Sequence, residues 1–185
     1  MSYEFADGYK IRDQGAPHFL TFTIVGWIDI FSRESYRKLM LHSLKYCREK
    51  KSLRIGAYVI MSNHLHLFWQ ADNNNLSDVV RDFKTYTSKA ITKAIETEEE
   101  SRREWLMYMF SFYARKTNAN EYYKVWTGNN HPEEIYSDKF MRTKLNYIHQ
   151  NPLRARLVAE PEHYLYSSAS NYATGKGLIE IDFLF

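Results

Sequence analysis

Two histidines stand two positions apart in the run His64–Gln70 (HLHLFWQ), whose apolar and aromatic residues are typical of a strand. Residues two apart on a strand point to the same face of the sheet, so the imidazoles of His64 and His66 would project together. Two converging imidazoles suit one metal ion. The spacing alone is more often that of ordinary surface histidines, so a metal site needs support from other residues.

A tyrosine and an asparagine lie one helical turn apart in the segment Ser137–Asn151. The apolar residues of this segment recur at steps of four and three and would form a buried stripe: Met141, Leu145 and Ile148. Tyr147 and Asn151 belong to the adjoining stripe, at the edge of the buried face, where a side chain can lean over a sheet and still meet solvent. The plainer alternative is a tyrosine that packs its ring and an asparagine that closes the helix.

Positive charge gathers around this helix, although the whole chain has a formal net charge of only +3. Asp138 is the single acidic residue between Ser137 and Arg156, a segment that holds five cations: Lys139, Arg142, Lys144, Arg154 and Arg156. A second group of cations precedes it in the chain: Lys84, Lys89 and Lys93. Such surfaces attract phosphates, and the alternative is a solvated helix face.

Composition limits the class of protein. The 185 residues are 44% apolar and include a single cysteine, Cys47, so they predict a packed core and exclude a disulfide framework. The uncharged stretch between Asp13 and Asp29 is too short for a membrane span, and no signal segment opens the chain. We expect one cytoplasmic domain over 1–185, with its core at about 18–173 and a tail at 174–185, and no membrane partner.

Local patterns predict strands and helices in alternation. The expected strands are Phe19–Trp27, Arg54–Met61, His64–Gln70 and Tyr122–Trp126. The expected helices run from a Ser32 cap to about Lys50, over about 76–94, over the aromatic-rich Ser101–Ala119, and from a Ser137 cap to about Asn151, where Pro152 would end the helix. This order predicts an α+β fold of the ferredoxin-like βαββαβ type, an antiparallel sheet with helices mainly on one face. The apolar tail Ile179–Phe185 would be an edge strand or a docking segment.

Three ordered motifs resemble a known family. They are Tyr58–Trp69 (YVIMSNHLHLFW), Tyr147–Pro152 (YIHQNP) and Tyr166–Ser168 (YSS), with the pair Val125-Trp126 between the first and the second. The pattern is similar to that of the single-tyrosine HUH transposases, and most similar to the REP-associated tyrosine transposases, over about Phe19–Tyr172. Ser62 stands where the family usually has proline and Tyr166 where tryptophan is common, and neither exchange removes a catalytic group.

The resemblance implies roles for these residues. His64, His66 and Asn151 would bind a divalent metal, Mg²⁺ or Mn²⁺, and Tyr147 would attack a DNA phosphate to form a 5′-phosphotyrosine. The substrate would be single-stranded DNA with a foldback hairpin, held by cations: Lys84, Lys89, Arg142, Lys144, Arg154 and Arg156. The protein would act at the bacterial nucleoid as a monomer or a homodimer.

Three alternatives stay open. A ferredoxin-like sheet with exposed aromatics can bind single-stranded nucleic acid without any chemistry. A former transposase can serve as a regulator on the same fold. Finally, Tyr86 could be the nucleophile, since Lys84 and Lys89 lie near it, although no potential metal ligand follows it at helical spacing as Asn151 follows Tyr147.

Overall fold

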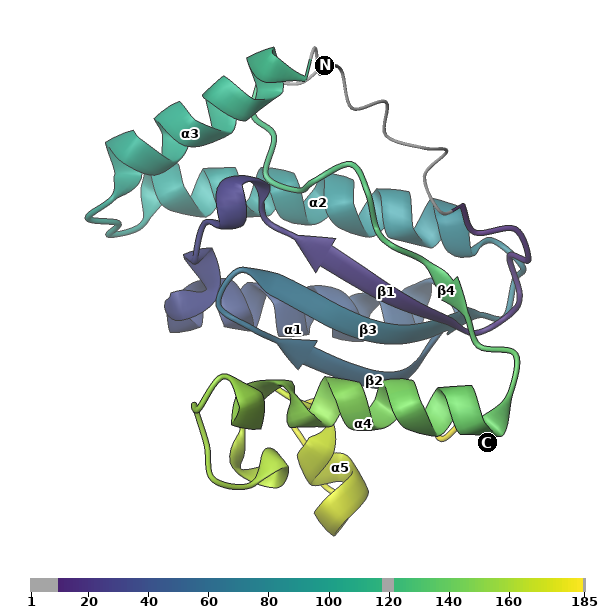
Figure 1. The fold of residues 1–185 in the computed structure, drawn as a ribbon. Coiled ribbons are helices and arrows are strands. Elements are labelled where there is room, and N and C mark those ends of the chain that lie inside the picture. The colour runs from purple at the N-terminus through teal and green to yellow at the C-terminus, as the bar shows by residue number, and fades with distance from the viewer. Residues whose placement is uncertain (1–9, 118–121, 185) are drawn as a thin grey trace, which may run out of the picture.

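The computed structural model describes residues 10–117 and 122–184, which fold around a four-stranded antiparallel sheet (Figure 1). Its strands are β1 (His18–Thr23), β2 (Leu53–Ile60), β3 (His64–Ala71) and β4 (Glu133–Glu134), in the spatial order β2-β3-β1-β4. The strand order and the α+β content confirm the predicted ferredoxin-like fold.

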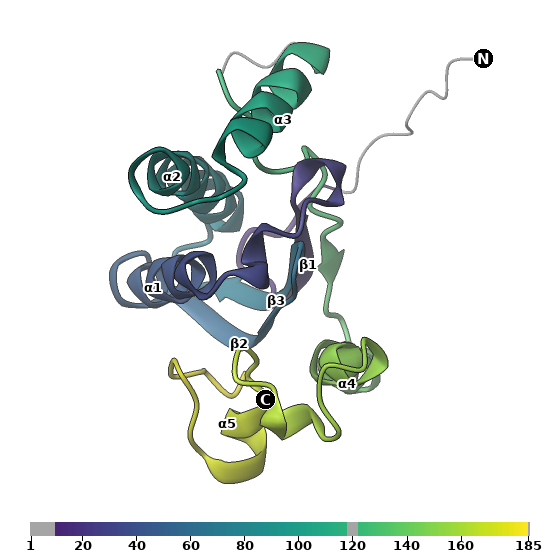
Figure 2. The same cartoon turned by 90° about the vertical axis from the view of Figure 1, so that its left-hand side faces the viewer.

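Helices α1 (Glu34–Lys50) and α2 (Leu76–Thr97) cover one face of the sheet (Figure 2). Alternation along β3 explains this packing, because Leu65, Leu67 and Trp69 are fully buried and point to the helices. The Trp69 ring meets the Phe83 ring of α2 edge-on, with 5.3 Å between centroids. His64 and His66 therefore point to the opposite face.

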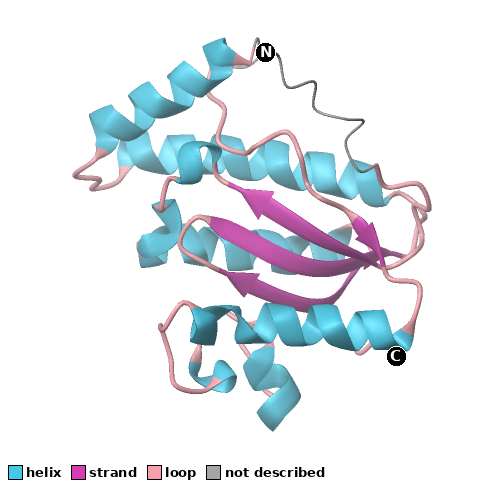
Figure 3. Ribbon diagram, viewed as in Figure 1, coloured by secondary structure: helices cyan, strands magenta, loops and turns pink. Residues whose placement is uncertain are grey.

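Helix α4 (Asp138–Arg154) lies across that opposite side, where it packs against β2 and β3 (Figures 1 and 2). The short helices η3 (Pro161–His163) and α5 (Ala169–Thr174) follow it. Helix α3 (Arg103–Lys116) projects from the end of α2, far from α4 (Figure 3).

The first strand is shorter than predicted and ends at Thr23. The chain then enters a short turn, η1 (Val25–Trp27), within which Gly26 adopts a left-handed conformation with a φ of 63°. A Cβ atom at Gly26 would lie 2.7 Å from the hydroxyl of Tyr113 on α3, so only glycine fits this approach. A second 3-10 turn, η2 (Ile30–Ser32), delays α1 until Glu34, so Ser32 does not cap it.

The predicted strand Tyr122–Trp126 is wrong, because Trp126 forms only an isolated bridge with Ile24. The Trp126 side chain is buried, and its Nε1 donates to the Thr87 hydroxyl at 3.0 Å. This segment therefore packs into the core and does not extend the sheet. The fourth strand is the two-residue β4, which pairs with His18 and Phe19 of β1.

Helix α4 begins as predicted, since the Ser137 hydroxyl accepts a hydrogen bond from the Phe140 N–H at 3.3 Å. Its predicted end is wrong, because the helix continues through Pro152 to Arg154. Pro152 is buried, and the carbonyls of Asn151 and Pro152 accept from the N–H groups of Ala155 and Leu157 at 3.0 and 2.9 Å. The hydrogen bonding of the last turn thus continues past Pro152, although proline itself has no N–H to donate.

The described part of the tail docks onto β2 and α1 and forms no strand. The Asp182 N–H donates to the Ile55 carbonyl at 2.8 Å, and the Asp182 carboxylate accepts from the Ile55 N–H at 3.0 Å. Arg48 of α1 donates to both oxygens of that carboxylate at 3.1 Å. Within 10–117 and 122–184, no helix is both long and apolar enough to cross a membrane.

Candidate functional site

His64 and His66 share the face of β3 that α1 and α2 leave uncovered. Their ring centroids are 4.7 Å apart, and the ring planes make an angle of 70°. The antiparallel register places Thr23 and Thr21 of β1 directly beside them. The His66 residue is only 6% exposed, whereas His64 is partly open to solvent.

One polar neighbour holds each imidazole through its Nδ1 atom. The Asn63 side-chain oxygen lies 2.7 Å from His64 Nδ1, and the Thr21 hydroxyl lies 2.9 Å from His66 Nδ1. The Asn63 oxygen can only accept, so His64 Nδ1 carries the hydrogen and Nε2 keeps its lone pair. The Thr21 contact allows the same tautomer at His66, which would leave two Nε2 lone pairs for a ligand.

Burial favours the uncharged form of both rings. Burial, with smaller contributions from the neighbouring His64 and Lys144, lowers the pKa of His66 to about 3. Burial also lowers the pKa of His64. Neutral imidazole is the form that binds a metal ion, so the site is ready for one near neutral pH without the loss of a proton.

Tyr147 of α4 completes an aromatic cluster on the same face. Its ring centroid is 5.0 Å from that of His66 and 5.9 Å from that of Phe19, both in edge-on geometry. The residue is 36% exposed, so it touches the buried histidine and solvent at once. Helix α4 thus brings the predicted tyrosine to the predicted histidines from a distant part of the chain.

Solvent reaches Tyr147 through an open pocket of about 610 Å³. Besides Tyr147, its walls are Lys139, Arg142, Thr143, Asn146 and Arg154. The Arg154 guanidinium lies over the Tyr147 ring, 5.5 Å from the centroid. The pocket therefore combines a phenol with three cations, a combination that suits a phosphate.

Asn151 lies one turn beyond Tyr147 on α4 and is half-buried. Within the described residues its backbone carbonyl accepts from Ala155, while its side-chain amide has no hydrogen-bond partner. The amide oxygen is therefore available to a ligand.

The predicted DNA-contacting cations fall into three groups. Arg142 and Arg154 line the pocket, and Arg156 is exposed just beyond α4. Lys144 is mostly buried, with its ammonium 2.6 Å from the Glu133 carboxylate and 4.5 Å from the centroid of the Phe19 ring.

Lys84 and Lys89 lie on α2, away from Tyr147. The Lys84 ammonium donates to the Thr127 carbonyl at 2.7 Å and to the Asn130 side-chain oxygen at 2.6 Å. Burial lowers the pKa of Lys84 to about 8. Its two hydrogen bonds hold the ammonium inside the fold, whereas Lys89 is exposed.

The sequence did not single out Thr21, Asn63 or Trp27 for the site. The Trp27 ring meets the His64 ring edge-on, with 6.4 Å between centroids. Asn63 could have been found as the neighbour of His64, but the contact of Thr21 depends on a cross-strand register that no local pattern reveals. Tyr86, the alternative nucleophile, is on α2 in a groove with Tyr46 and Cys47 of α1.

A ferredoxin-like sheet with two histidines facing a helical tyrosine is the arrangement expected of a single-tyrosine transposase. A family model described as "Transposase IS200 like" matches residues 27–128, more than half of the chain, and the chain belongs to that family. The match includes His64 and His66 and ends before Tyr147.

A solved structure described as the REP-associated tyrosine transposase bound to a REP hairpin has a similar fold. Its TM-score is 0.64 at 15% sequence identity, and the alignment covers 97% of this chain and 94% of that one. Identity at this level supports the fold alone. No curated protein sequence matches the chain.

Proposed function

We propose that this member of the IS200-like family is a metal-dependent enzyme that nicks and rejoins single-stranded DNA through a covalent bond to Tyr147. The contact between the Tyr147 ring and His66, 5.0 Å between centroids, carries the proposal, because it joins a nucleophile to a pair of neutral imidazoles. Among the described residues, the Tyr86 ring on α2 has no ring contact with a histidine pair of this kind.

The donor atoms present fit a divalent cation. His64 and His66 would each offer Nε2, and Asn151 would offer its side-chain oxygen, a mixed nitrogen and oxygen set that suits Mg²⁺ or Mn²⁺. Within the described residues no cluster of three or more histidines, cysteines or carboxylates occurs, so this set depends on the amide of Asn151. When bound, such an ion polarises the scissile phosphate and offsets its developing charge.

Tyr147 would act as the nucleophile. Its phenolic oxygen attacks the phosphorus, the bond from phosphorus to the 3′-oxygen breaks, and the departing oxygen becomes a 3′-hydroxyl while the phenol loses its proton. The product is a 5′-phosphotyrosine, and attack by another 3′-hydroxyl reverses the step and joins the strands. The Arg154 guanidinium, 5.5 Å from the centroid of the Tyr147 ring, would offset negative charge on the phosphate that Tyr147 attacks.

The cations beside Tyr147 would hold the DNA backbone. Arg142 and Arg154 line the pocket, and Arg156 is exposed just beyond α4. Lys144 would add positive potential, although Glu133 pairs with it. We propose a hairpin-bearing substrate, since the structure of similar fold is described as bound to a REP hairpin.

The test is covalent capture of labelled single-stranded DNA, with and without a hairpin, in Mn²⁺ or Mg²⁺. The wild type should yield an adduct that survives denaturing electrophoresis. Tyr147→Phe keeps the ring but should yield none, whereas Tyr86→Phe, the matched control on α2, should retain it. His64→Ala and His66→Ala should lose the adduct and keep the fold, because neither ring fills the main core.

The result also separates enzyme from binding module. An adduct on Tyr147→Phe would refute the assigned nucleophile. Tight DNA binding by the wild type with no adduct on any DNA tested would favour the non-catalytic alternative or a regulator.

A further inference from the structure

Helix α3 exposes large aromatic side chains that the proposed chemistry does not use. Trp105, Tyr108 and Phe112 recur at helical spacing and are 47%, 61% and 38% exposed. The rings of Tyr108 and Phe112 lie 6.4 Å apart at an angle of 22°, so they are nearly parallel. Exposed apolar side chains that cluster in this way mark a binding surface.

This surface is continuous with the candidate site. Trp27, 68% exposed, meets the His64 ring edge-on, and its neighbour Gly26 lies against the Tyr113 ring of α3. Tyr113 in turn contacts Phe112, with 5.4 Å between ring centroids. We call this line of rings the aromatic track: Trp27, Tyr113, Phe112, Tyr108 and Trp105.

Cations accompany the track. The Arg102 guanidinium and the Lys116 ammonium each lie 6.0 Å from a ring centroid, those of Trp105 and Phe112 respectively. The α3 sequence holds Arg103, Arg115 and Lys116 against the single acidic residue Glu104. Rings with cations beside them suit a strand that presents bases and phosphates together.

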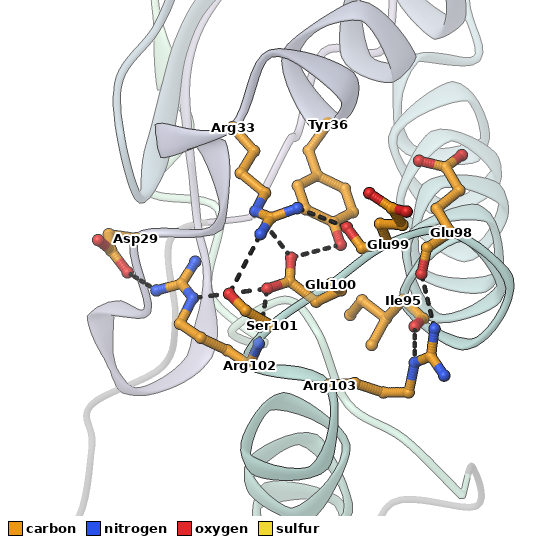
Figure 4. A network of polar contacts seen from close by, with 10 residues as sticks. All are labelled: Asp29, Arg33, Tyr36, Ile95, Glu98, Glu99, Glu100, Ser101, Arg102 and Arg103. Carbon is orange, nitrogen blue, oxygen red and sulfur yellow. Dashed lines mark hydrogen bonds and ion pairs between the residues drawn. The ribbon is translucent and has the colours of Figure 1, made fainter.

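The corner between α2 and α3 holds the track in place (Figure 4). The Glu100 carboxylate, whose side chain has no exposure, accepts from the Tyr36 hydroxyl at 3.0 Å and pairs with Arg33 at 3.3 Å. Arg102 bonds Asp29 at 2.7 Å.

At the same corner Arg103 donates to the carbonyls of Ile95 and Glu98 at 2.8 and 2.7 Å, as Figure 4 shows. Helix α3 is therefore tied to both α1 and the end of α2. The track is formed before any ligand arrives, which reduces the entropy lost on binding.

We propose that the aromatic track binds the single-stranded DNA that flanks the bond cut at Tyr147. Bases stack on the exposed rings, and phosphates contact Lys116 beside Phe112. The assignment of the strand to the cleavage site rests on the proposed function, whereas the binding itself does not. A protein partner is the other occupant of such a surface, and the cations beside the rings favour DNA over it.

Binding is measured without chemistry, in the Tyr147→Phe background with chelator, by the anisotropy of a labelled oligothymidylate. Stacking contributes about 1–3 kcal/mol per base, so the double change Tyr108→Ser with Phe112→Ser should weaken binding at least about tenfold. The matched control is Tyr46→Ser with Tyr86→Ser, two tyrosines that are 51% and 58% exposed on the α1/α2 side. The control should bind as tightly as its parent.

Tryptophan fluorescence gives a second measurement of binding, which can be made without the serine substitutions in the track. Of the four tryptophans, Trp69 and Trp126 are buried, at 0% and 5% exposure, whereas Trp27 and Trp105 belong to the track. Oligothymidylate should quench the emission, and Trp105→Phe should remove part of that quenching.

Equal affinity of the track variant and the control, or no quenching at saturating DNA, would overturn the proposal. So would a dimer that the track variant alone dissociates, since the track would then be a protein interface. Failure of the proposed nicking function would give a different result. DNA would still bind the aromatic track, but the wild type would form no covalent adduct.

Discussion

Each histidine of the site depends on one neighbouring side chain that holds its ring through Nδ1. Thr21 holds Nδ1 of His66 and Asn63 holds Nδ1 of His64. Partners of this kind typically change metal affinity by about 10- to 100-fold when they are removed.

Thr21→Val keeps the size and the strand preference of the side chain but removes the hydroxyl. We expect Mn²⁺ affinity to fall at least about tenfold, because His66 loses the partner that orients its ring. Calorimetric titration with Mn²⁺ measures this, and Thr85→Val on the exposed side of α2 is the control. Equal affinity in both variants would contradict the role of Thr21.

Lys84 gives a prediction on pH dependence. Burial, aided by Lys124, lowers its pKa to about 8 from the ordinary 10.5, so the folded protein loses this proton before the unfolded chain does. Between these values the unfolded state binds more protons, and stability rises with pH. Relative to Lys84→Met, the wild type should gain about 1.5 kcal/mol between about pH 8 and about pH 9.5.

Urea unfolding of both proteins across this range measures the difference, in which other titrating groups cancel. A difference that stays flat with pH would show that Lys84 is not buried as a charge. The same variant should bind DNA as the wild type does, since Lys84 faces Thr127 and Asn130.

At the residue scale, the sequence predicted what strict periodicity controls. Two residues on a strand share a face, so His64 and His66 were expected together, and they are. The role of Tyr147 beside these histidines was predicted only from the resemblance to the single-tyrosine transposases. Thr21 and the burial of Lys84 could not be predicted, because both depend on which segment lies alongside after folding.

At the element scale, α4 carries the tyrosine and depends on its cap. Ser137→Ala removes the acceptor for the Phe140 N–H and should cost about 1 kcal/mol, or about 2–4 °C in Tm. Thermal unfolding measures it, with Ser77→Ala at the start of α2 as the control, whose hydroxyl caps nothing. Equal Tm values would mean that tertiary packing alone holds this end of α4.

The anchoring of α3 is the second feature to test at this scale. Glu100→Gln removes the charge that Arg33 and Arg102 share and should cost about 2–3 kcal/mol, below the value for a fully buried pair because both arginines are partly exposed. Urea unfolding measures the loss, and Glu104→Gln, an exposed residue of α3, is the control. Affinity for oligothymidylate should fall as well, whereas a change in affinity without a change in stability would contradict the anchoring role.

The predicted boundaries of strands and helices were wrong where tertiary contacts override the local preference of the sequence. Residues 122–126 have strand-forming side chains, yet Trp126 is drawn into the core by Thr87 and Phe22. Pro152 should end α4, yet it is buried and the following N–H groups still find partners. Both outcomes depend on neighbours that are distant in sequence.

At the scale of the whole molecule, the fold followed from the order of elements, whereas the placement of α3 did not. The formal net charge of +3 is small, so DNA attraction depends on where the cations lie. Those beside Tyr147 form one patch, and α3 forms another.

If the patch beside Tyr147 holds DNA as proposed, we expect that binding to be salt-dependent. The pair of changes Arg142→Gln and Arg154→Gln should lower the slope of log affinity against log salt by about 0.7 for each phosphate of single-stranded DNA that is no longer neutralised. Anisotropy titrations at several salt concentrations in chelator measure it, with Arg81→Gln on α2 as the control. A slope that Arg81→Gln changes equally would place the phosphate path elsewhere.

Helix α3 lies between β3 and α4 in sequence, yet in space it projects from the C-terminal end of α2 and lies apart from α4 (Figure 1). Its exposed side chains can therefore change while the histidines, the tyrosine and their supports stay intact. Strand binding by α3 and bond cleavage at Tyr147 could then evolve independently of each other. A nicking protein built this way can be directed to new strands by redesign of one helix surface, with its bond-breaking chemistry left alone.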